Sequence, residues 1–318
     1  MDSLLSPRLL QKLSFLGSIS KHQLVSYLTL LEARNYAQGT LDAIVGIIKR
    51  LLLHLPQQRL PTITDDLAKT SSSDIDYFVS SARAKGLSPS TINISLSTLK
   101  ELFDFLREDG QMQVQPIIRR RHRLFAPTTL PKPVAEEDLI KLFKVIDSLR
   151  DRLIFLLMLR CGLRVSEVCR LTWQAVDLQA STIRVNNGKG QVDRIAYISP
   201  DLEKALDLWH QCSSQSEYLF PSRNVRLAPL GRREIHCLMS KYLRLANIDK
   251  RYYPHCLRHT FATQLLNAGV SLEVLKELMG HRSIQMTLRY TQLYESTKRR
   301  QYEQAMENIE RRQANLGR

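Results

Sequence analysis

Apolar residues recur every three or four positions through most of the first 106 residues, which is the spacing of one face of an α-helix. Residues 1–18 contain six leucines at this spacing and predict an amphipathic helix. Residues 21–55 carry two further patterns and predict a helical hairpin. Two more helices are expected, one after possible cap residues at 71–74 and one over residues 90–106. The first part of the chain is therefore predicted to be a domain of four or five helices.

The second part of the chain mixes helical and strand-like patterns. Residues 135–146 and 151–160 predict two helices, and Gly162 is expected to end the second one. Residues 182–185 and 195–198 alternate apolar and polar positions, which predicts two strands joined as a hairpin. Helical patterns resume beyond Pro254. The whole chain is thus predicted to be mainly α with a small β-hairpin or sheet.

A proline-rich and basic segment separates these two parts. Pro116, Pro127, Pro131 and Pro133 lie within 18 residues, which predicts an extended linker. The expected organisation is a helical domain over residues 1–115, a linker over 116–133, and an α/β domain with a helical C-terminal tail over 134–318. Four arginines in the linker are either a solvated tether or a strap along a phosphate backbone: Arg119, Arg120, Arg121 and Arg123.

The charge balance indicates a polyanionic partner. Lys and Arg exceed Asp and Glu by 15, with a pI of about 9.8, and the excess is divided between the two halves of the chain. We find no apolar run long enough to span a membrane and no signal peptide. The five cysteines are odd in number and have no paired spacing, which favours a reducing, cytoplasmic location.

Four residues suited to phosphate chemistry fall within a short C-terminal stretch. His255 and Arg258 are three positions apart at the start of a helical pattern, His281 follows Gly280, and Tyr290 comes nine positions later. Breaking a phosphodiester requires a nucleophile, charge stabilisation for the non-bridging oxygens and a proton for the leaving oxygen. These side chains can fill such roles. Each one alone is commonplace, so only their joint spacing supports a catalytic reading.

Two earlier motifs add cations. Arg164 precedes a short predicted helix that Ser166 can cap, and Glu167 can hold the guanidinium of Arg164 by a charge-assisted contact. Lys189 lies at the glycine-flanked tip of the predicted hairpin, where a lysine can either serve solubility alone or deliver a proton near a phosphate. Arg194, on the second strand, is expected to contact a DNA backbone.

A zinc site is the alternative reading of His255 and His259, which have the i, i+4 spacing of metal ligands on a helix. Arg258 lies between them and no glutamate accompanies them, so the local field opposes a cation. We therefore predict no metal ligands.

The order R-x-x-E, GKG, H-x-x-R, Gly-His and Tyr resembles the catalytic domain of the tyrosine recombinases, also called the phage integrase or Xer family. The helical first part loosely resembles the DNA-binding core-binding domain of that family. The resemblance implies six active-site positions: Arg164, Lys189, His255, Arg258, His281 and Tyr290.

The resemblance also implies the chemistry. Tyr290 would attack a DNA phosphate to form a 3′-phosphotyrosyl bond, and no cofactor would be needed because the ester stores the bond energy. Arg164 and Arg258 would clamp the phosphate and His281 would hydrogen-bond it, while Lys189 would protonate the leaving oxygen. His255 would accept or relay the tyrosine proton. The expected partners are double-stranded DNA carrying recombination sites and three further copies of the chain, with accessory proteins possible, at the cytoplasmic nucleoid.

Two rival functions remain open at the level of sequence. One is a type IB topoisomerase, which shares the chemistry but relaxes DNA without exchanging partners. The other is a DNA-binding regulator on the same fold without catalysis. A regulator has no need of Tyr290, so the full set of positions favours an enzyme.

Overall fold

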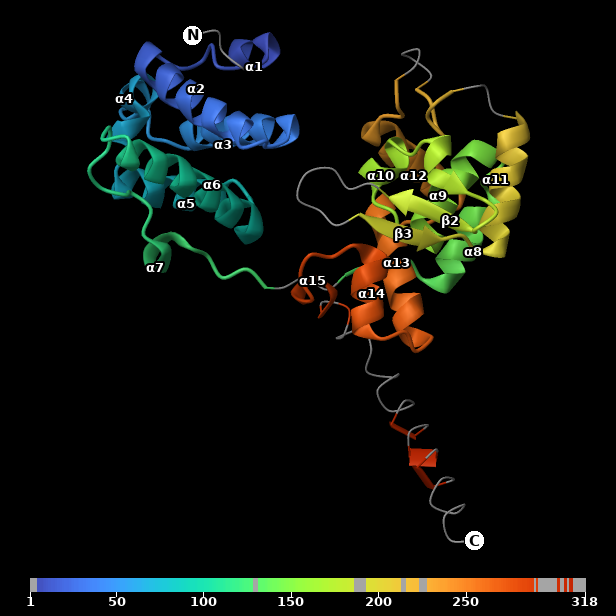
Figure 1. Ribbon diagram of the computed structural model, residues 1–318. Coiled ribbons are helices and arrows are strands. Elements are labelled where there is room, and N and C mark those ends of the chain that lie inside the picture. Colours follow the sequence, from blue (N-terminus) through green and yellow to red (C-terminus); the bar gives the residue numbers. More distant parts are fainter. Residues whose placement is uncertain are drawn as a thin grey trace. The chain divides into compact units, whose positions relative to one another are not determined.

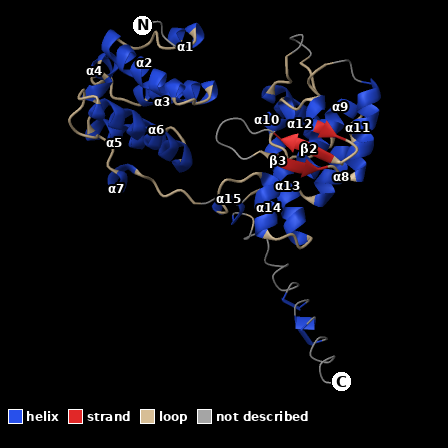
Figure 2. Ribbon diagram, viewed as in Figure 1, coloured by secondary structure: helices blue, strands red, loops and turns tan. Residues whose placement is uncertain are grey.

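We describe the protein from a computed structural model, which defines residues 5–127, 131–185, 193–212, 216–222, 228–288, 290 and six residues of the C-terminal tail. The chain forms two compact units, Met1–Thr128 and Thr129–Arg318 (Figure 1). The division falls inside the segment predicted to be a linker. The prediction of a mainly helical chain with a small sheet and two domains is confirmed (Figure 2).

The regular elements of the first unit are helices throughout its described residues. They are α1 (Pro7–Gln11), α2 (Ser18–Ala33), α3 (Gln38–Leu53), α4 (Leu60–Asp65), the 3-10 turn η1 (Leu67–Lys69), α5 (Ser72–Ala84), α6 (Pro89–Glu108) and α7 (Arg119–His122). The apolar faces of these helices meet in one core, in which Leu24, Ile48, Phe78 and Phe103 are fully buried. The periodic pattern in the sequence therefore marks the buried side of each long helix.

Two helix starts in this unit are fixed by side-chain caps. Ser71 and Asp74 form a reciprocal capping box at α5, as the sequence predicts. Arg59 reaches the same carboxylate through Nε at 2.8 Å. Ser88 caps α6, and Pro89 occupies its first turn, where a missing N–H costs nothing.

The prediction of one helix over residues 1–18 is wrong. The helix α1 ends at Gln11, and turns lead to α2 at Ser18. Gly17 is the N-cap residue of α2, where its N–H donates to the Thr64 carbonyl and any Cβ would lie 2.8 Å from the backbone of Asp65. The leucines with helical spacing are still buried, although the helix stops at Gln11: Leu5, Leu9, Leu13 and Leu16.

The prediction that residues 116–133 are extended throughout is also wrong. Arg119–His122 form α7, and His122 is buried against the first unit. Beyond α7, the backbone of Leu124 is held by the side chain of Asn93. The Asn93 amide donates to the Leu124 carbonyl at 2.8 Å and accepts from the Leu124 N–H at 2.9 Å. The proline content gave no sign of these contacts, which join residues 31 positions apart.

The second unit surrounds the helix α9 with further helices and a small sheet. Its elements are α8 (Glu136–Lys144), α9 (Leu149–Arg160), α10 (Val165–Cys169), η2 (Trp173–Ala175), β1 (Val176–Asp177), β2 (Thr182–Val185), β3 (Arg194–Tyr197), α11 (Pro200–Cys212), α12 (Arg232–Leu245), α13 (Pro254–Asn267), α14 (Leu272–Met279) and α15 (Gln285–Leu288). The three strands are antiparallel in the order β1-β2-β3, drawn in red in Figure 2. The hairpin was predicted, whereas the two-residue strand β1 was not.

Glycines end the helices that surround the candidate site. Gly162, Gly269 and Gly280 all have positive φ, at 60°, 98° and 60°, and follow α9, α13 and α14. At Gly162 a side chain is excluded twice, because an added Cβ would lie 2.5 Å from the ring of Phe261. In the described residues, no helix is both long and apolar enough to cross a membrane.

Candidate active site

Arg164 stands immediately before α10 and is held there by Glu167. The carboxylate of Glu167 accepts the Arg164 backbone N–H at 2.7 Å and the Arg164 Nη1 at 2.6 Å. The expected contact between the two side chains is therefore present. The helix cap differs from the prediction, because Arg164 itself is the N-cap residue and Glu167, rather than Ser166, satisfies its backbone.

Arg194, predicted to contact a DNA backbone, is buried in an ion pair with Glu167. Its side chain is only 4% exposed, and Nη1 and Nη2 donate to the two oxygens of Glu167 at 3.1 and 2.7 Å. Burial alone would raise the pKa of Glu167, but the hydrogen bonds and charge of Arg194, followed by those of Arg164, lower this pKa to about 2. Glu167 thus stays ionised and joins the two guanidinium groups. Arg194 is a supporting residue of the site in this structure.

Arg258 is the most deeply buried cation of the site, at 1% exposure. Its guanidinium donates to the carbonyl oxygen of Gly162 and, at 2.5 Å, to that of Met279. Burial, and then the neighbouring charges of Arg164 and Arg194, lower the pKa of Arg258 to about 9. Because this value lies above neutral, Arg258 remains charged at pH 7 and is held by the ends of two helices.

The guanidinium groups of Arg164 and Arg258 both bind backbone carbonyls at the C-terminal end of α14. Arg164 Nη2 donates to the carbonyl of Gly280 at 3.2 Å, next to the carbonyl that Arg258 uses. Helix C-termini carry partial negative charge, which favours cations there. An added Cβ at Gly280 would lie 3.0 Å from the Arg194 side chain, so the absence of a side chain at Gly280 makes room for Arg194. In Figure 1, α13, α14 and β3 lie together in the second unit.

His281 follows Gly280 and is buried, with Nδ1 2.9 Å from Thr287 Oγ1. Burial, and then the positive charges of Arg258, Arg164 and Arg194, lower the pKa of His281 to about 3. The imidazole is therefore neutral at pH 7. With Nδ1 engaged by Thr287, the remaining ring nitrogen can serve as a hydrogen-bond donor to an anion at this place.

Tyr290 is buried, at 3% exposure, in an apolar cluster with Phe261, Leu275 and Met279. Tyr290 lies off the apolar stripe of Ile284, Leu288 and Thr291, so the helical pattern of the sequence gave no sign of this burial. Its hydroxyl lies 2.7 Å from Nδ1 of His259. The phenol ring thus lies in the core, while its oxygen contacts His259 on α13.

His259 is the site residue that the sequence reading missed. It was considered only as one half of a zinc pair with His255. The two rings do lie together, edge to face with centroids 4.6 Å apart, and His255 is the exposed member. The i, i+4 spacing was a valid signal of proximity, but the contact to Tyr290 spans 31 residues. Lys189 lies outside the described residues.

The arrangement is suited to binding an anion. The cluster holds three guanidinium groups, of Arg164, Arg194 and Arg258, against the one carboxylate of Glu167, which pairs with the first two, so the cluster carries excess positive charge. Arg164 is the one with an accessible side chain, at 22% exposure. In the described part of the chain, no group of three His, Cys, Asp or Glu side chains is arranged to hold a metal ion.

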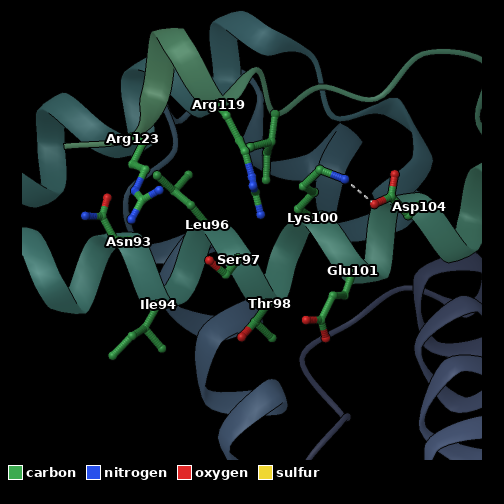
Figure 3. Close-up of a pocket in the computed structure, with 11 residues that line it drawn as sticks. Asn93, Ile94, Leu96, Ser97, Thr98, Lys100, Glu101, Asp104, Arg119 and Arg123 are labelled. Atoms are coloured by element: carbon green, nitrogen blue, oxygen red, sulfur yellow. Dashed lines mark hydrogen bonds and ion pairs between the residues drawn. The ribbon is translucent and has the colours of Figure 1, made fainter. Parts of the chain in front are cut away.

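The four arginines around α7 have different surroundings. Arg119 and Arg123 line a hollow of about 470 Å³ on the face of α6, together with Ser97 and Thr98, and Figure 3 shows both guanidinium groups turned towards that face. Arg121 instead donates to Asp76, through Nε at 2.9 Å. Arg120, like the other three, is exposed. The run thus offers a basic surface on the first unit, and Arg121 is partly neutralised within it.

Comparisons with known proteins identify the class of the chain. The Phage integrase family profile matches residues 133–297, and the profile of the phage integrase N-terminal SAM-like domain matches residues 18–110. Tyrosine recombinase XerA of Pyrococcus furiosus is 36% identical, over 68% of this chain and 74% of that protein. Tyrosine recombinase XerC of Bacillus subtilis is 30% identical, over 85% of this chain and 90% of that protein.

A solved structure agrees on the fold. A lambda integrase dimer bound to a COC′ core site superimposes with a TM-score of 0.69 at 18% identity, covering 85% of this chain and 94% of the other. The chain belongs to the phage integrase family, and it is a tyrosine-type site-specific recombinase, a DNA strand-transferring enzyme. The family resemblance and the enzyme class predicted from the sequence are thereby confirmed.

Proposed function

We propose that Tyr290 is the nucleophile that attacks the scissile phosphate and becomes linked to the 3′ end of the cleaved strand. Its hydroxyl is held by His259, and Tyr290 is close enough to Arg258 to affect the pKa of that guanidinium. A phenol oxygen beside guanidinium groups suits attack on a phosphodiester, because negative charge develops on both the nucleophile and the phosphoryl oxygens.

Arg164 and Arg258 bind the non-bridging oxygens of that phosphate. Arg164 is fixed by Glu167 and by the Gly280 carbonyl, and Arg258 is fixed by the carbonyls of Gly162 and Met279, so little reorganisation is needed when charge develops. Arg194 acts on the phosphate only through Glu167. The observation that carries the proposal is this convergence of Arg164, Arg258 and His281 at the end of α14, with Tyr290 packed in the apolar cluster that includes Met279 of that helix.

His281 donates a hydrogen bond to the bound phosphate as a neutral imidazole, and the exposed His255 packs against His259. Lys189 protonates the leaving 5′ oxygen, a role that rests on its matching position in the family pattern. The reaction uses no cofactor, because the phosphotyrosyl ester keeps the energy of the broken bond for rejoining.

The DNA partner is a duplex with specific recombination sites. Arg119, Arg120 and Arg123 of the first unit contact its phosphates, and the polar face of α6 beside them meets the duplex. Four copies of the chain assemble on two sites and cut two strands at a time, at the nucleoid of the cytoplasm.

A nicked duplex that loses a short strand after cleavage tests this proposal, because it traps the covalent complex. The wild-type protein is expected to form a complex with DNA that survives denaturant. Tyr290→Phe should form none, while its DNA affinity changes little, since one hydroxyl adds little to many phosphate contacts. An adduct formed equally by Tyr290→Phe would show that another residue attacks.

A further inference from the structure

His259 occupies the position from which a proton can be taken from Tyr290. Nδ1 of His259 lies 2.7 Å from the Tyr290 hydroxyl, within the range required of a general base and its proton donor. The ring is half-buried on α13, and the two rings lie with centroids 5.6 Å apart. The hydroxyl and the imidazole are thus in direct contact before any DNA is bound.

The other basic groups of the site are less suited to this task. Arg258 is charged and has no lone pair to accept a proton. His281 has Nδ1 engaged by Thr287, and its low pKa makes it a poor base. His255, to which the sequence assigned the proton, is exposed and reaches the hydroxyl's partner, His259, edge to face.

We propose that His259 is a catalytic residue of this recombinase, the base that accepts the proton of Tyr290. The assignment rests on the proposed role of Tyr290 as the nucleophile. It requires the neutral imidazole tautomer with hydrogen on Nε2, so that the Tyr290 hydroxyl donates to Nδ1.

The steps balance without any further reagent. The Tyr290 O–H bond breaks and its proton goes to His259 Nδ1, while the phenol oxygen forms a bond to phosphorus. The bond between phosphorus and the 5′ oxygen then breaks, and the leaving oxygen takes a proton from the general acid, Lys189. In the rejoining step a 5′-hydroxyl attacks phosphorus and gives its proton to Lys189, which cleavage left deprotonated, while the bond between Tyr290 and phosphorus breaks and Tyr290 recovers its proton from His259.

Two properties of the contact favour proton transfer over simple packing. An imidazole and a phenol have ordinary pKa values near 6.5 and 10, so a phenol gives up its proton far more readily to a contacting imidazole than to water. His255 lies against His259, with ring centroids 4.6 Å apart, and is exposed, which provides a path for the proton towards solvent.

The test compares His259→Asn with the wild type in single-turnover cleavage of the nicked duplex. An asparagine amide can occupy the place of Nδ1 and keep a hydrogen bond to Tyr290, but it cannot accept a proton. We expect the rate of adduct formation to fall by about 100-fold or more, which is the usual contribution of a general base. His236→Asn is the matched control, since His236 is exposed on α12, and it should cleave at the wild-type rate.

A fluorinated tyrosine at position 290 separates a base from a positioning contact. Its phenol is more acidic and needs less help to lose the proton, so it should restore the rate of His259→Asn and of His259→Ala at least tenfold. An unrestored rate, or a rate for His259→Asn within about threefold of the wild type, would overturn the assignment. Wild-type protein that forms no adduct, or an adduct that persists in Tyr290→Phe, would instead refute the nucleophile itself and His259 with it.

Discussion

Arg194 Nη2 donates to Glu167 Oε2 at 2.7 Å, and the two side chains are only 4% and 5% exposed. This buried ion pair places Arg194 behind Arg164, which shares the same carboxylate. In the proposed mechanism, Arg194 therefore supports Arg164, the residue that binds the phosphate.

Arg194→Ala should weaken the fold and the chemistry while leaving DNA binding almost intact. Breaking a buried ion pair typically lowers the free energy of unfolding by about 3 kcal/mol or more. Urea titration and gel-shift titration at several salt concentrations would measure both effects. A salt dependence of binding reduced by about 0.9 in log–log slope would mean that Arg194 does contact a phosphate, as the sequence first indicated.

The arginines of the first unit should behave in the opposite way. Arg119→Ala and Arg123→Ala are each expected to reduce the slope of log affinity against log salt by about 0.9, with little change in stability. Arg121→Ala is the matched control, because Asp76 already pairs with Arg121, and its slope should change less. Equal slope changes for all three would contradict the distinction drawn from their contacts.

Gly162→Ala should damage both the fold and the active site. The residue has φ of 60°, and an added Cβ would lie 2.5 Å from the Phe261 ring, so the ring or the helix end must move. We expect a loss of about 2 kcal/mol or more in the free energy of unfolding. Cleavage should fall as well, because the Gly162 carbonyl holds Arg258.

Gly46→Ala is the control for this substitution. Gly46 lies inside α3 with nothing within 4 Å of an added Cβ, and alanine is favoured there by up to about 1 kcal/mol. Its thermal midpoint should stay the same or rise. A tolerated Gly162→Ala with normal cleavage would contradict the role of this helix end.

The buried His281 should make the fold sensitive to acid. Its pKa is about 3 in the folded protein and near the ordinary 6.5 when unfolded, so below pH 6.5 the unfolded chain takes up a proton that the folded chain does not. Stability from this group is complete above pH 6.5 and is lost as the pH falls towards 3. His281→Gln should therefore show a smaller fall in thermal midpoint between pH 7 and pH 5 than the wild type, and parallel curves would contradict the assignment.

Local signals in the sequence predicted the long helices of the first unit, the hairpin and several helices of the second unit. Apolar periodicity located the long helices, and glycines marked the ends of α9, α13 and α14. The pairing of Arg164 with Glu167 was also predictable, because side chains three positions apart at the start of a helix lie close together. These features depend on neighbours in the chain.

Contacts between distant residues could not be predicted in this way. The burial of Arg194 depends on Glu167, which is 27 positions earlier, and the hydroxyl of Tyr290 meets His259 across 31 positions. Periodicity along a four-residue helix also says little about Tyr290, whose ring is buried by α13 and α14. Such placements follow from packing in three dimensions.

The most direct test of the account is to locate the covalent bond between protein and DNA. The complex trapped on a nicked duplex would be digested with protease and nuclease, and the modified peptide sequenced by mass spectrometry. We predict a nucleotide attached through its 3′ phosphate to Tyr290, with Tyr294, the next tyrosine in the sequence, unmodified. Attachment at Tyr294 or at any other residue would contradict the active site described here.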